Sequence, residues 1–186
     1  MARLLPGSTI GILGGGQLGR MTAMAARELG YLIRVLDPDP SCAARFVVEE
    51  LIAAPFDDDV AAAWLAHRSD VVTLHLSYTP ETHGLVSRAL LSRMKPTAYV
   101  VNTARARLVD NAALAELLES GTIAGAALDV HDEEPPAADD PFRRLPNVLL
   151  TPHIGYNTVE AGANMLRIAV ATLEAYLRGE RLHVVT

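Results

Sequence analysis

Three side chains with complementary chemistry stand near the ends of predicted β-strands: Arg105, Glu134 and His153. Histidine titrates near neutral pH, so it can take a proton from a hydroxyl group and return it to a carbonyl oxygen. A carboxylate beside it holds the imidazole in one tautomer and favours its protonated form. Arginine binds a carboxylate through two hydrogen bonds. The set suits interconversion of a 2-hydroxy acid and a 2-keto acid, if a hydride carrier binds nearby.

Each of these residues also has an ordinary interpretation when it is taken alone. Arg105 could be a solvated loop charge, and Glu134 could belong to an acidic, proline-rich loop at 131–141. His153 could cap a helix or lie in the core. The catalytic interpretation therefore depends on a fold that brings all three to one place.

A candidate site for the hydride carrier is the loop 14–19, of sequence GGGQLG. It lies between an apolar run at 9–13 and a helical stretch at 20–29. In that context glycines let the backbone turn tightly and approach a pyrophosphate at the helix N-terminus. A glycine-rich turn without a ligand is the alternative. We predict that five residues of the loop bind the dinucleotide: Gly14, Gly16, Gln17, Leu18 and Gly19.

An acidic residue, Asp37, ends the second predicted strand, 18 residues beyond Gly19. This is near the spacing at which a carboxylate meets the ribose of a bound dinucleotide. The carboxylate would accept hydrogen bonds from the 2′- and 3′-hydroxyls and would repel a 2′-phosphate, so NAD is favoured over NADP. The alternative is a turn at 37–40 that only closes the strand.

The elements that must position these residues alternate between strand-like and helix-like segments along the whole chain. Strands are expected at 9–13, 32–36, near the end of 47–54, and at 71–76, 98–102, 123–130 and 147–151. Helices are expected at 20–29, 57–67, 79–94, 111–119 and 158–177. The alternation predicts an α/β fold with a doubly wound, Rossmann-like parallel sheet and helices on both faces. We expect one domain over 1–186, closed by the last helix at about 158–178.

In such sheets, ligands bind beyond the carboxyl ends of the strands. His75 follows the fourth predicted strand, Thr103 follows the fifth, and Asp129 lies at the end of the sixth. These three residues therefore join the candidates at the same edge of the sheet as Asp37 and the glycine loop.

The composition of the chain limits the classes of partner that it can bind. Half of the 186 residues are apolar and a fifth are charged, which allows a sizeable core, and the net charge of −6 comes with no basic patch. We therefore expect a small-molecule partner, and neither nucleic acid nor a membrane. Cys42 is the only cysteine, so neither a disulfide nor a thiolate metal cage can form within the chain. We expect no metal and a reducing, cytoplasmic location.

From about Ser69 to Thr186 the chain resembles the nucleotide-binding domain and closing helix of the D-isomer-specific 2-hydroxyacid dehydrogenases. The resemblance rests on the segments 69–76 (SDVVTLHL), 79–82 (TPET), 101–105 (VNTAR), 125–130 (GAALDV), 134–135 (EP) and 152–156 (PHIGY). It implies that Arg105 binds the substrate and that Glu134 pairs with the catalytic His153. It also implies that Asp129 holds the nicotinamide carboxamide, and Gly155 joins the candidate cofactor-binding residues.

The sequence departs from this family at Ser77, Ala106 and Asn111, which affects local loop geometry and cofactor affinity. The first 68 or so residues resemble another protein, the N-terminal domain of N5-carboxyaminoimidazole ribonucleotide synthetase, a member of the ATP-grasp family. Gly15 in particular occupies a position where the dehydrogenases normally have another residue. These observations predict a composite chain, engineered or recombined, with a junction near residues 68–73.

Three functional hypotheses follow. The first is an NAD(H)-binding domain of D-2-hydroxyacid dehydrogenase type with an incomplete active site, because no chain precedes residue 1 to build the family's substrate domain. The second is a structural chimera that binds nothing tightly. The third is an active dehydrogenase whose substrate pocket is completed by a second copy. We expect a homodimer; the substrate acid itself is not identified by the sequence.

Overall fold

The computed structural model describes residues 4–183. The chain forms two compact units, Met1–His153 and Ile154–Thr186, and each is described by itself. The expected single domain over 1–186 remains a prediction.

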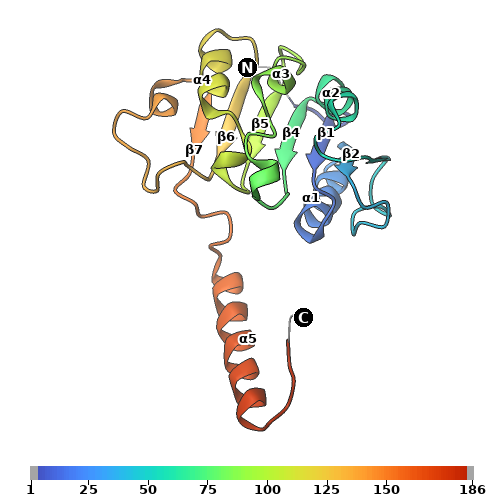
Figure 1. Cartoon of the computed structure of the whole chain (residues 1–186), viewed down its shortest axis with the longest axis vertical. Helices are drawn as coiled ribbons and strands as arrows, with labels where there is room; N and C mark the ends of the chain where they lie inside the picture. The colour runs from blue at the N-terminus through green and yellow to red at the C-terminus, as the bar shows by residue number, and fades with distance from the viewer. Residues whose placement is uncertain (1–3, 184–186) are drawn as a thin grey trace. The chain divides into compact units, whose positions relative to one another are not determined.

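The first unit is built on one sheet of seven parallel strands in the order β3-β2-β1-β4-β5-β6-β7 (Figure 1). The strands are β1 (Thr9–Leu13), β2 (Leu32–Asp37), β3 (Glu50–Ala53), β4 (Val71–Leu74), β5 (Tyr99–Asn102), β6 (Gly125–Leu128) and β7 (Val148–Leu150). All seven expected strands are present. The order reverses direction at β1, because the chain first builds outward through β2 and β3 and then from β4 to β7. This confirms the doubly wound, Rossmann-like sheet.

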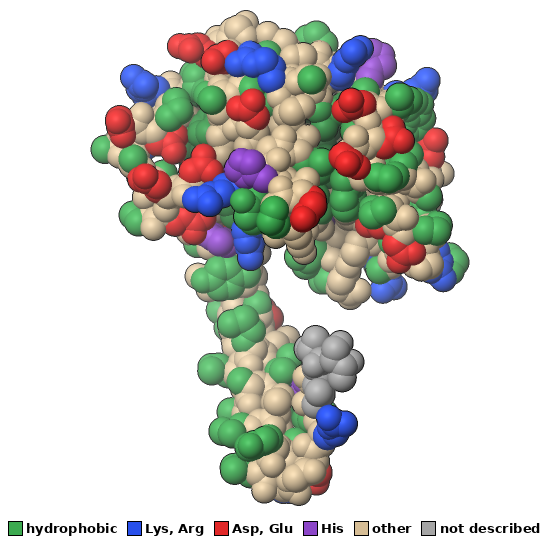
Figure 2. Space-filling model, in the orientation of Figure 1, with side chains coloured by type: hydrophobic (Ala, Val, Ile, Leu, Met, Phe, Trp, Pro, Cys, Tyr) green, Lys and Arg blue, Asp and Glu red, His purple; other side chains and the backbone are tan. Residues whose placement is uncertain are grey.

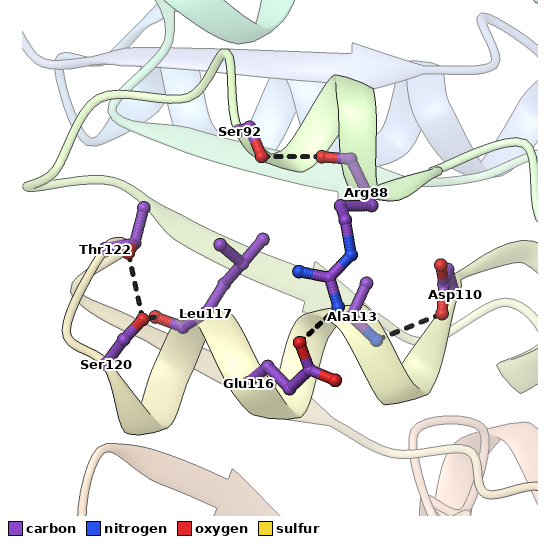
Figure 3. A network of polar contacts seen from close by, with 8 residues as sticks. All are labelled: Arg88, Ser92, Asp110, Ala113, Glu116, Leu117, Ser120 and Thr122. Atoms are coloured by element: carbon purple, nitrogen blue, oxygen red, sulfur yellow. Dashed lines mark hydrogen bonds and ion pairs between the residues drawn. The ribbon is translucent and has the colours of Figure 1, made fainter.

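Four α-helices and three short 3₁₀-helices connect these strands. They are α1 (Gln17–Glu28), α2 (Asp59–Arg68), α3 (Arg88–Leu91), α4 (Asn111–Glu119), η1 (Pro80–Thr82), η2 (Ala106–Leu108) and η3 (Pro141–Arg144). Two aspartates begin helices as N-caps. Asp58 accepts hydrogen bonds from the second and third amides of α2, and Asp110 accepts one from Ala113 in α4. Figure 3 shows the Asp110 cap together with the ion pair between Arg88 of α3 and Glu116 of α4.

The prediction of one helix over 79–94 is wrong for the middle of this range. The chain forms only η1 near its start and the short α3 near its end. Gly84 has a φ of +62°, which no α-helix permits. The following backbone pairs with another segment, since the Val86 amide donates to the carbonyl of Leu108 at 2.9 Å. Ser87 then caps α3. Pairing with 107–109 therefore satisfies the backbone groups that a continuous helix would have used.

Helices cover both faces of the sheet, as expected. Alternate residues of each strand point to opposite faces, and the two hydrophobic clusters follow this alternation. Leu13 packs in the cluster that contains residues of α2, α3 and α4, whereas its neighbour Ile12 packs with Ala23 and Ala26 of α1. Both β1 residues are almost completely buried. Packing on both faces of the sheet therefore fixes the carboxyl ends of these strands.

The second unit contains α5 (Val159–Leu177), at the position expected from the sequence. Thr158 begins it, because its hydroxyl accepts a hydrogen bond from the Ala161 amide at 3.0 Å. Gly179, with a φ of +74°, ends it. Hydrophobic side chains project along the helix in Figure 2. Within residues 4–183, none of the helices has the length and apolar character needed to cross a membrane.

Candidate functional site

The parallel register sets the ends of six strands side by side. Leu13, Leu36, Leu74, Asn102, Leu128 and Leu150 lie in one row across the sheet. The backbone ladder continues one residue further, where the amides of Gly14, His75, Asp129 and Thr151 donate to carbonyls of that row at 2.7–3.0 Å. Asp37 and Thr103 occupy the same level on β2 and after β5. The structure thus brings these sequence-predicted residues to one edge.

Two glycines of the loop 14–19 are required by the fold itself. Gly14 has a φ of +102°, and a Cβ there would lie 2.6 Å from the backbone oxygen of His75. A Cβ on Gly19 would lie 2.0 Å from the carbonyl oxygen of Gly14. Gly16 is different, because a Cβ built on it meets no atom within 4 Å. Its lack of a side chain keeps open a space beside the start of α1.

The N-terminus of α1 faces that space with unused donors. The first helical hydrogen bond runs from the Arg20 amide to the Gly16 carbonyl at 2.9 Å, and no side chain caps the helix. The amides of the first three helical residues, Gln17, Leu18 and Gly19, therefore have no partner within the helix. Such amides, with the partial positive charge of the helix end, bind phosphate groups. The residues present fit a dinucleotide pyrophosphate.

Asp37 is buried and is hydrogen-bonded to the glycine loop. Its Oδ2 accepts from the Gly15 amide at 2.6 Å, and its Oδ1 accepts from the Asp39 amide at 2.9 Å. Each carboxylate oxygen can accept a second hydrogen bond, so ribose hydroxyls can still bind here. The structure thus adds a positioning role to the ribose-binding role that the spacing predicts.

Gly15 is explained by its contact with Cys42. A Cβ on Gly15 would lie 2.6 Å from the Cys42 sulfur and 3.0 Å from Cγ1 of Val35. The Ala44 amide also donates to the Gly15 carbonyl at 2.9 Å. Cys42 is buried, and its burial raises the pKa of the thiol. Cys42, which the sequence did not single out for the site, therefore packs against the glycine loop.

A cavity of about 400 Å³ adjoins the loop. It is lined by Leu18, His75, Leu76, Ser77, Tyr78, Thr103, Ala104 and Arg105. The start of α1 and the segments after β4 and β5 therefore share one hollow. Tyr78 is a lining residue that the sequence did not single out, and its hydroxyl lies 3.3 Å from Nδ1 of His83. The sequence could have indicated Tyr78 as a lining residue, because it directly follows Ser77 in the segment after β4.

His75 is held at the wall of this cavity. Its Nε2 lies 3.1 Å from the hydroxyl of Thr73. Burial lowers the pKa of the imidazole below its ordinary value, because desolvation disfavours the charged form. His75 therefore contributes a neutral ring near neutral pH.

Arg105 is exposed, and the turn that carries it is held by Asn102. The buried Asn102 amide donates to the carbonyl oxygen of Arg105 at 2.9 Å, and its Oδ1 accepts from the Ala104 amide at 3.0 Å. These bonds fix the backbone on both sides of the arginine's Cα. The guanidinium itself is held only locally: its Nη1 donates to the carbonyl of the neighbouring Ala104 at 2.6 Å.

Glu134 and His153 form a pair. His153 Nδ1 lies 2.7 Å from Glu134 Oε2, and the His131 amide donates to Oε1 at 3.2 Å. The bond from His153, then that from the His131 amide, lowers the pKa of the Glu134 carboxyl, so it stays ionised. His153 has a φ of +55°, a conformation that is uncommon outside glycine. The pair has the arrangement of a histidine acid–base and its orienting carboxylate.

Asp129 directly follows β6. It is buried, and the Thr151 hydroxyl donates to its Oδ1 at 2.5 Å. Gly155 belongs to the second unit, and its predicted cofactor contact remains a prediction. Within residues 4–183 there is no group of three or more His, Cys, Asp or Glu side chains that could hold a metal ion.

A parallel sheet with a glycine loop, a carboxylate after β2 and a histidine–carboxylate pair defines a Rossmann-type dinucleotide-binding domain with acid–base residues at its edge. Residues 1–155 match the family described as D-isomer specific 2-hydroxyacid dehydrogenase, NAD binding domain. The chain belongs to this family, which confirms NAD as the expected cofactor.

Relatives and solved structures agree with this assignment. The chain is 40% identical over 176 residues to a glyoxylate reductase of Thermofilum pendens, covering 95% of this chain and 50% of that protein. It is 39% identical over 177 residues to a D-3-phosphoglycerate dehydrogenase of Methanocaldococcus jannaschii, covering 95% and 32%. A D-lactate dehydrogenase with NAD⁺ from Lactobacillus jensenii has a similar structure, with a TM-score of 0.84, 29% identity and coverage of 96% and 55%. The chain thus spans about half the length of these relatives, or less.

The comparisons give no support to the composite origin suggested by residues 1–68. The family match starts at residue 1 and runs through the expected junction at 68–73. One family therefore accounts for both halves of the chain. The glycine at position 15, which suggested a different source, follows from its packing against Cys42.

Proposed function

We propose that this chain binds NAD(H) at the carboxyl edge of its sheet and that Arg105, Glu134 and His153 serve hydride transfer between a small 2-hydroxy acid and its 2-keto acid. The carrying observation is the 2.7 Å contact between His153 Nδ1 and Glu134 Oε2, after the last strands of the sheet that carries the glycine loop. When bound, NAD supplies the group that accepts or donates the hydride.

The groups of this chain that would bind the cofactor lie in the glycine loop and at the ends of the strands. The amides of Gln17, Leu18 and Gly19 would receive the pyrophosphate, in the space kept open by Gly16. Asp37 would accept hydrogen bonds from the adenosine ribose. Asp129 would hold the nicotinamide carboxamide, as the family resemblance implies.

The acid–base step falls to His153. Its Nδ1–H donates to Glu134, so Nε2 is the nitrogen that takes the hydroxyl proton in oxidation and returns it to the carbonyl oxygen in reduction. The ionised Glu134 stabilises the imidazolium that forms. Arg105 binds the substrate carboxylate through two hydrogen bonds and orients the reacting carbon.

We propose that residues 1–186 by themselves turn over substrate slowly. The curated relatives are about two to three times as long as the matched region, and Arg105 is exposed on its turn. Enclosing and orienting the substrate can supply several kcal/mol of a catalytic barrier. The cytoplasmic location expected from the single cysteine belongs to the same proposal.

A homodimer is part of the proposal. Val71, Val101, Ala127 and Leu149 line an apolar hollow of about 500 Å³ over β4–β7, and Leu149 is 63% exposed. Burying such a surface favours association. Light scattering over a wide concentration range tests this, with Leu149→Lys expected to shift a dimer toward monomer; a monomer at every concentration would contradict it.

The test of the cofactor site is calorimetric titration with NADH of the wild type and of Gly16→Ala. Gly16 has a φ of −65°, which alanine adopts without strain, so the variant should fold normally. Its methyl group would fill the space proposed for the pyrophosphate, and we expect roughly tenfold weaker binding or more, about 1.4 kcal/mol.

Gly162→Ala is the matched control, since a Cβ there also meets no atom within 4 Å and the residue belongs to α5, in the second unit. It should bind NADH as the wild type does. Equal NADH affinity in the Gly16→Ala variant, or no saturable binding by the wild type, would refute the proposed cofactor site.

A further inference from the structure

His131 is hydrogen-bonded to Glu134 and to Thr151, which lies two residues before His153. Its backbone amide donates to Glu134 Oε1 at 3.2 Å, and its Nε2 lies 2.9 Å from the carbonyl oxygen of Thr151. A carbonyl oxygen only accepts hydrogen bonds, so Nε2 of His131 carries the proton in this contact. His131 thus binds the Glu134 carboxylate directly, and it also binds the end of the strand that leads to His153.

Three hydrogen bonds hold Thr151. Its amide donates to the Leu128 carbonyl at 3.0 Å, its hydroxyl donates to Asp129 Oδ1 at 2.5 Å, and its carbonyl accepts from His131. The first two bonds fix the strand end to β6. The third fixes the peptide plane that leads toward Pro152 and His153.

The backbone of His153 needs such support. A φ of +55° is unfavourable for any residue with a Cβ atom, and it persists only where the surroundings enforce it. This conformation directs Nδ1 to Glu134. Loss of a restraint at Thr151, two residues earlier, would let the segment relax toward ordinary backbone angles and move the imidazole away from the carboxylate.

We propose that His131 is a positioning residue for the acid–base pair. Its Nε2–H anchors the Thr151 carbonyl and thereby keeps His153 in the orientation in which Nδ1 donates to Glu134. His131, Glu134, His153 and Thr151 form a closed ring, in which three hydrogen bonds and the covalent segment 151–153 restrain one another. This inference rests on the proposed role of the pair, and its test needs no turnover.

The imidazole of His131 also lines a hollow of about 300 Å³ with Pro136, Arg143, Leu150, Thr151 and Pro152. Side chains of similar size can therefore replace it without overpacking. His131→Phe keeps a planar ring and removes the donor. His131→Gln keeps an N–H donor, and His131→Met has nearly the same shape as glutamine but no donor.

The experiment is nitrogen-15 NMR of the histidine side chains at a pH where the imidazoles are neutral, with assignment of His153 through His153→Gln. In the wild type, His153 should hold one tautomer, with the proton on Nδ1. In His131→Phe we expect both tautomers and roughly fivefold faster solvent exchange of the Nδ1 proton, the factor for one net hydrogen bond. His67→Phe, at the exposed end of α2, is the matched control and should leave His153 unchanged.

His131→Gln and His131→Met settle the result if the phenylalanine variant does not fold. The glutamine variant should keep the wild-type tautomer and the methionine variant should lose it. A single Nδ1–H tautomer with wild-type exchange in the variants without a donor would overturn the positioning role, even if their thermal stability falls. An intact wild-type tautomer without NADH binding in the calorimetric titration would instead refute the proposed function alone.

Discussion

The amide nitrogen of Gly15 lies 2.6 Å from Oδ2 of Asp37, so the end of β2 is hydrogen-bonded to the loop that precedes α1. The same carboxylate accepts from the Asp39 amide through its other oxygen. The group proposed for the ribose therefore also shapes the loop proposed for the pyrophosphate. We therefore expect binding of the two halves of the cofactor to be coupled through this one buried side chain.

Asp37→Ala tests this coupling. It should weaken NADH binding by roughly tenfold to a hundredfold, because bonds to a charged acceptor contribute about 1.5–3 kcal/mol. It should also lower the free energy of unfolding by about 1–3 kcal/mol, because the Gly15 amide loses its partner. Titration calorimetry and urea unfolding measure the two effects. A loss of NADH affinity with unchanged stability would show that the Gly15 contact has no structural role.

The contact between Gly15 and Cys42 predicts a non-additive pair of substitutions. Gly15→Ala alone should destabilise the protein by about 1–3 kcal/mol, because the new methyl group would overlap the Cys42 sulfur. Cys42→Ala removes that sulfur, so the double variant should be less destabilised than the sum of the single variants. Urea unfolding of all four proteins gives the coupling free energy. Additive effects would contradict the packing explanation of Gly15.

Much of the fold was predictable because it depends on local patterns. The apolar runs indicated all seven strands, and helix α4 begins at Asn111 as expected; the structure adds Asp110 as its N-cap. The helix at 79–94 was wrong because its middle is decided by a distant partner. Val86 pairs with the backbone at 108, a contact that no pattern within residues 79–94 could reveal.

The candidate site, too, was predictable only in part. The positions of Asp37, His75 and Asp129 followed from where the strands end. The roles of Cys42 and His131 did not, because they come from contacts between segments far apart in the chain. Gly15 shows the consequence most clearly, since its unusual identity suggested another family until its neighbour in space was known.

Asn102 provides a prediction for the substrate side of the site. Asn102→Ala removes the side chain that holds the carbonyl of Arg105 and the amide of Ala104, and it should cost about 1–3 kcal/mol of stability. If the turn then loosens, Arg105 samples more orientations, and binding of oxalate to the NADH complex should weaken. Asn147→Ala, which removes side-chain bonds to the carbonyls of Leu118 and Ala124 at the opposite end of the sheet, is the control. Thermal unfolding and titration with oxalate measure both effects, and unchanged oxalate affinity would contradict the positioning of Arg105 by this turn.

The buried His75 predicts a pH dependence of stability. Burial lowers the pKa of His75 in the folded protein below its ordinary value of 6.5. Between the folded and unfolded pKa values the unfolded chain binds more protons, so the free energy of unfolding rises with pH in this window. Stability is therefore complete above about pH 6.5 and falls as the pH drops toward the folded pKa, by at most about 1.4 kcal/mol per pH unit.

His75→Gln should remove this contribution, because glutamine is neutral in both states and can still bind the Thr73 hydroxyl. Urea unfolding at a series of pH values from neutral to mildly acidic should show a smaller loss of stability in the variant than in the wild type. His67→Gln removes an exposed histidine and should leave the wild-type pH dependence in place. Parallel curves for the wild type and His75→Gln would mean that His75 takes up its proton equally in the folded and unfolded chain, and its burial at the cavity wall would then have no effect on its charge.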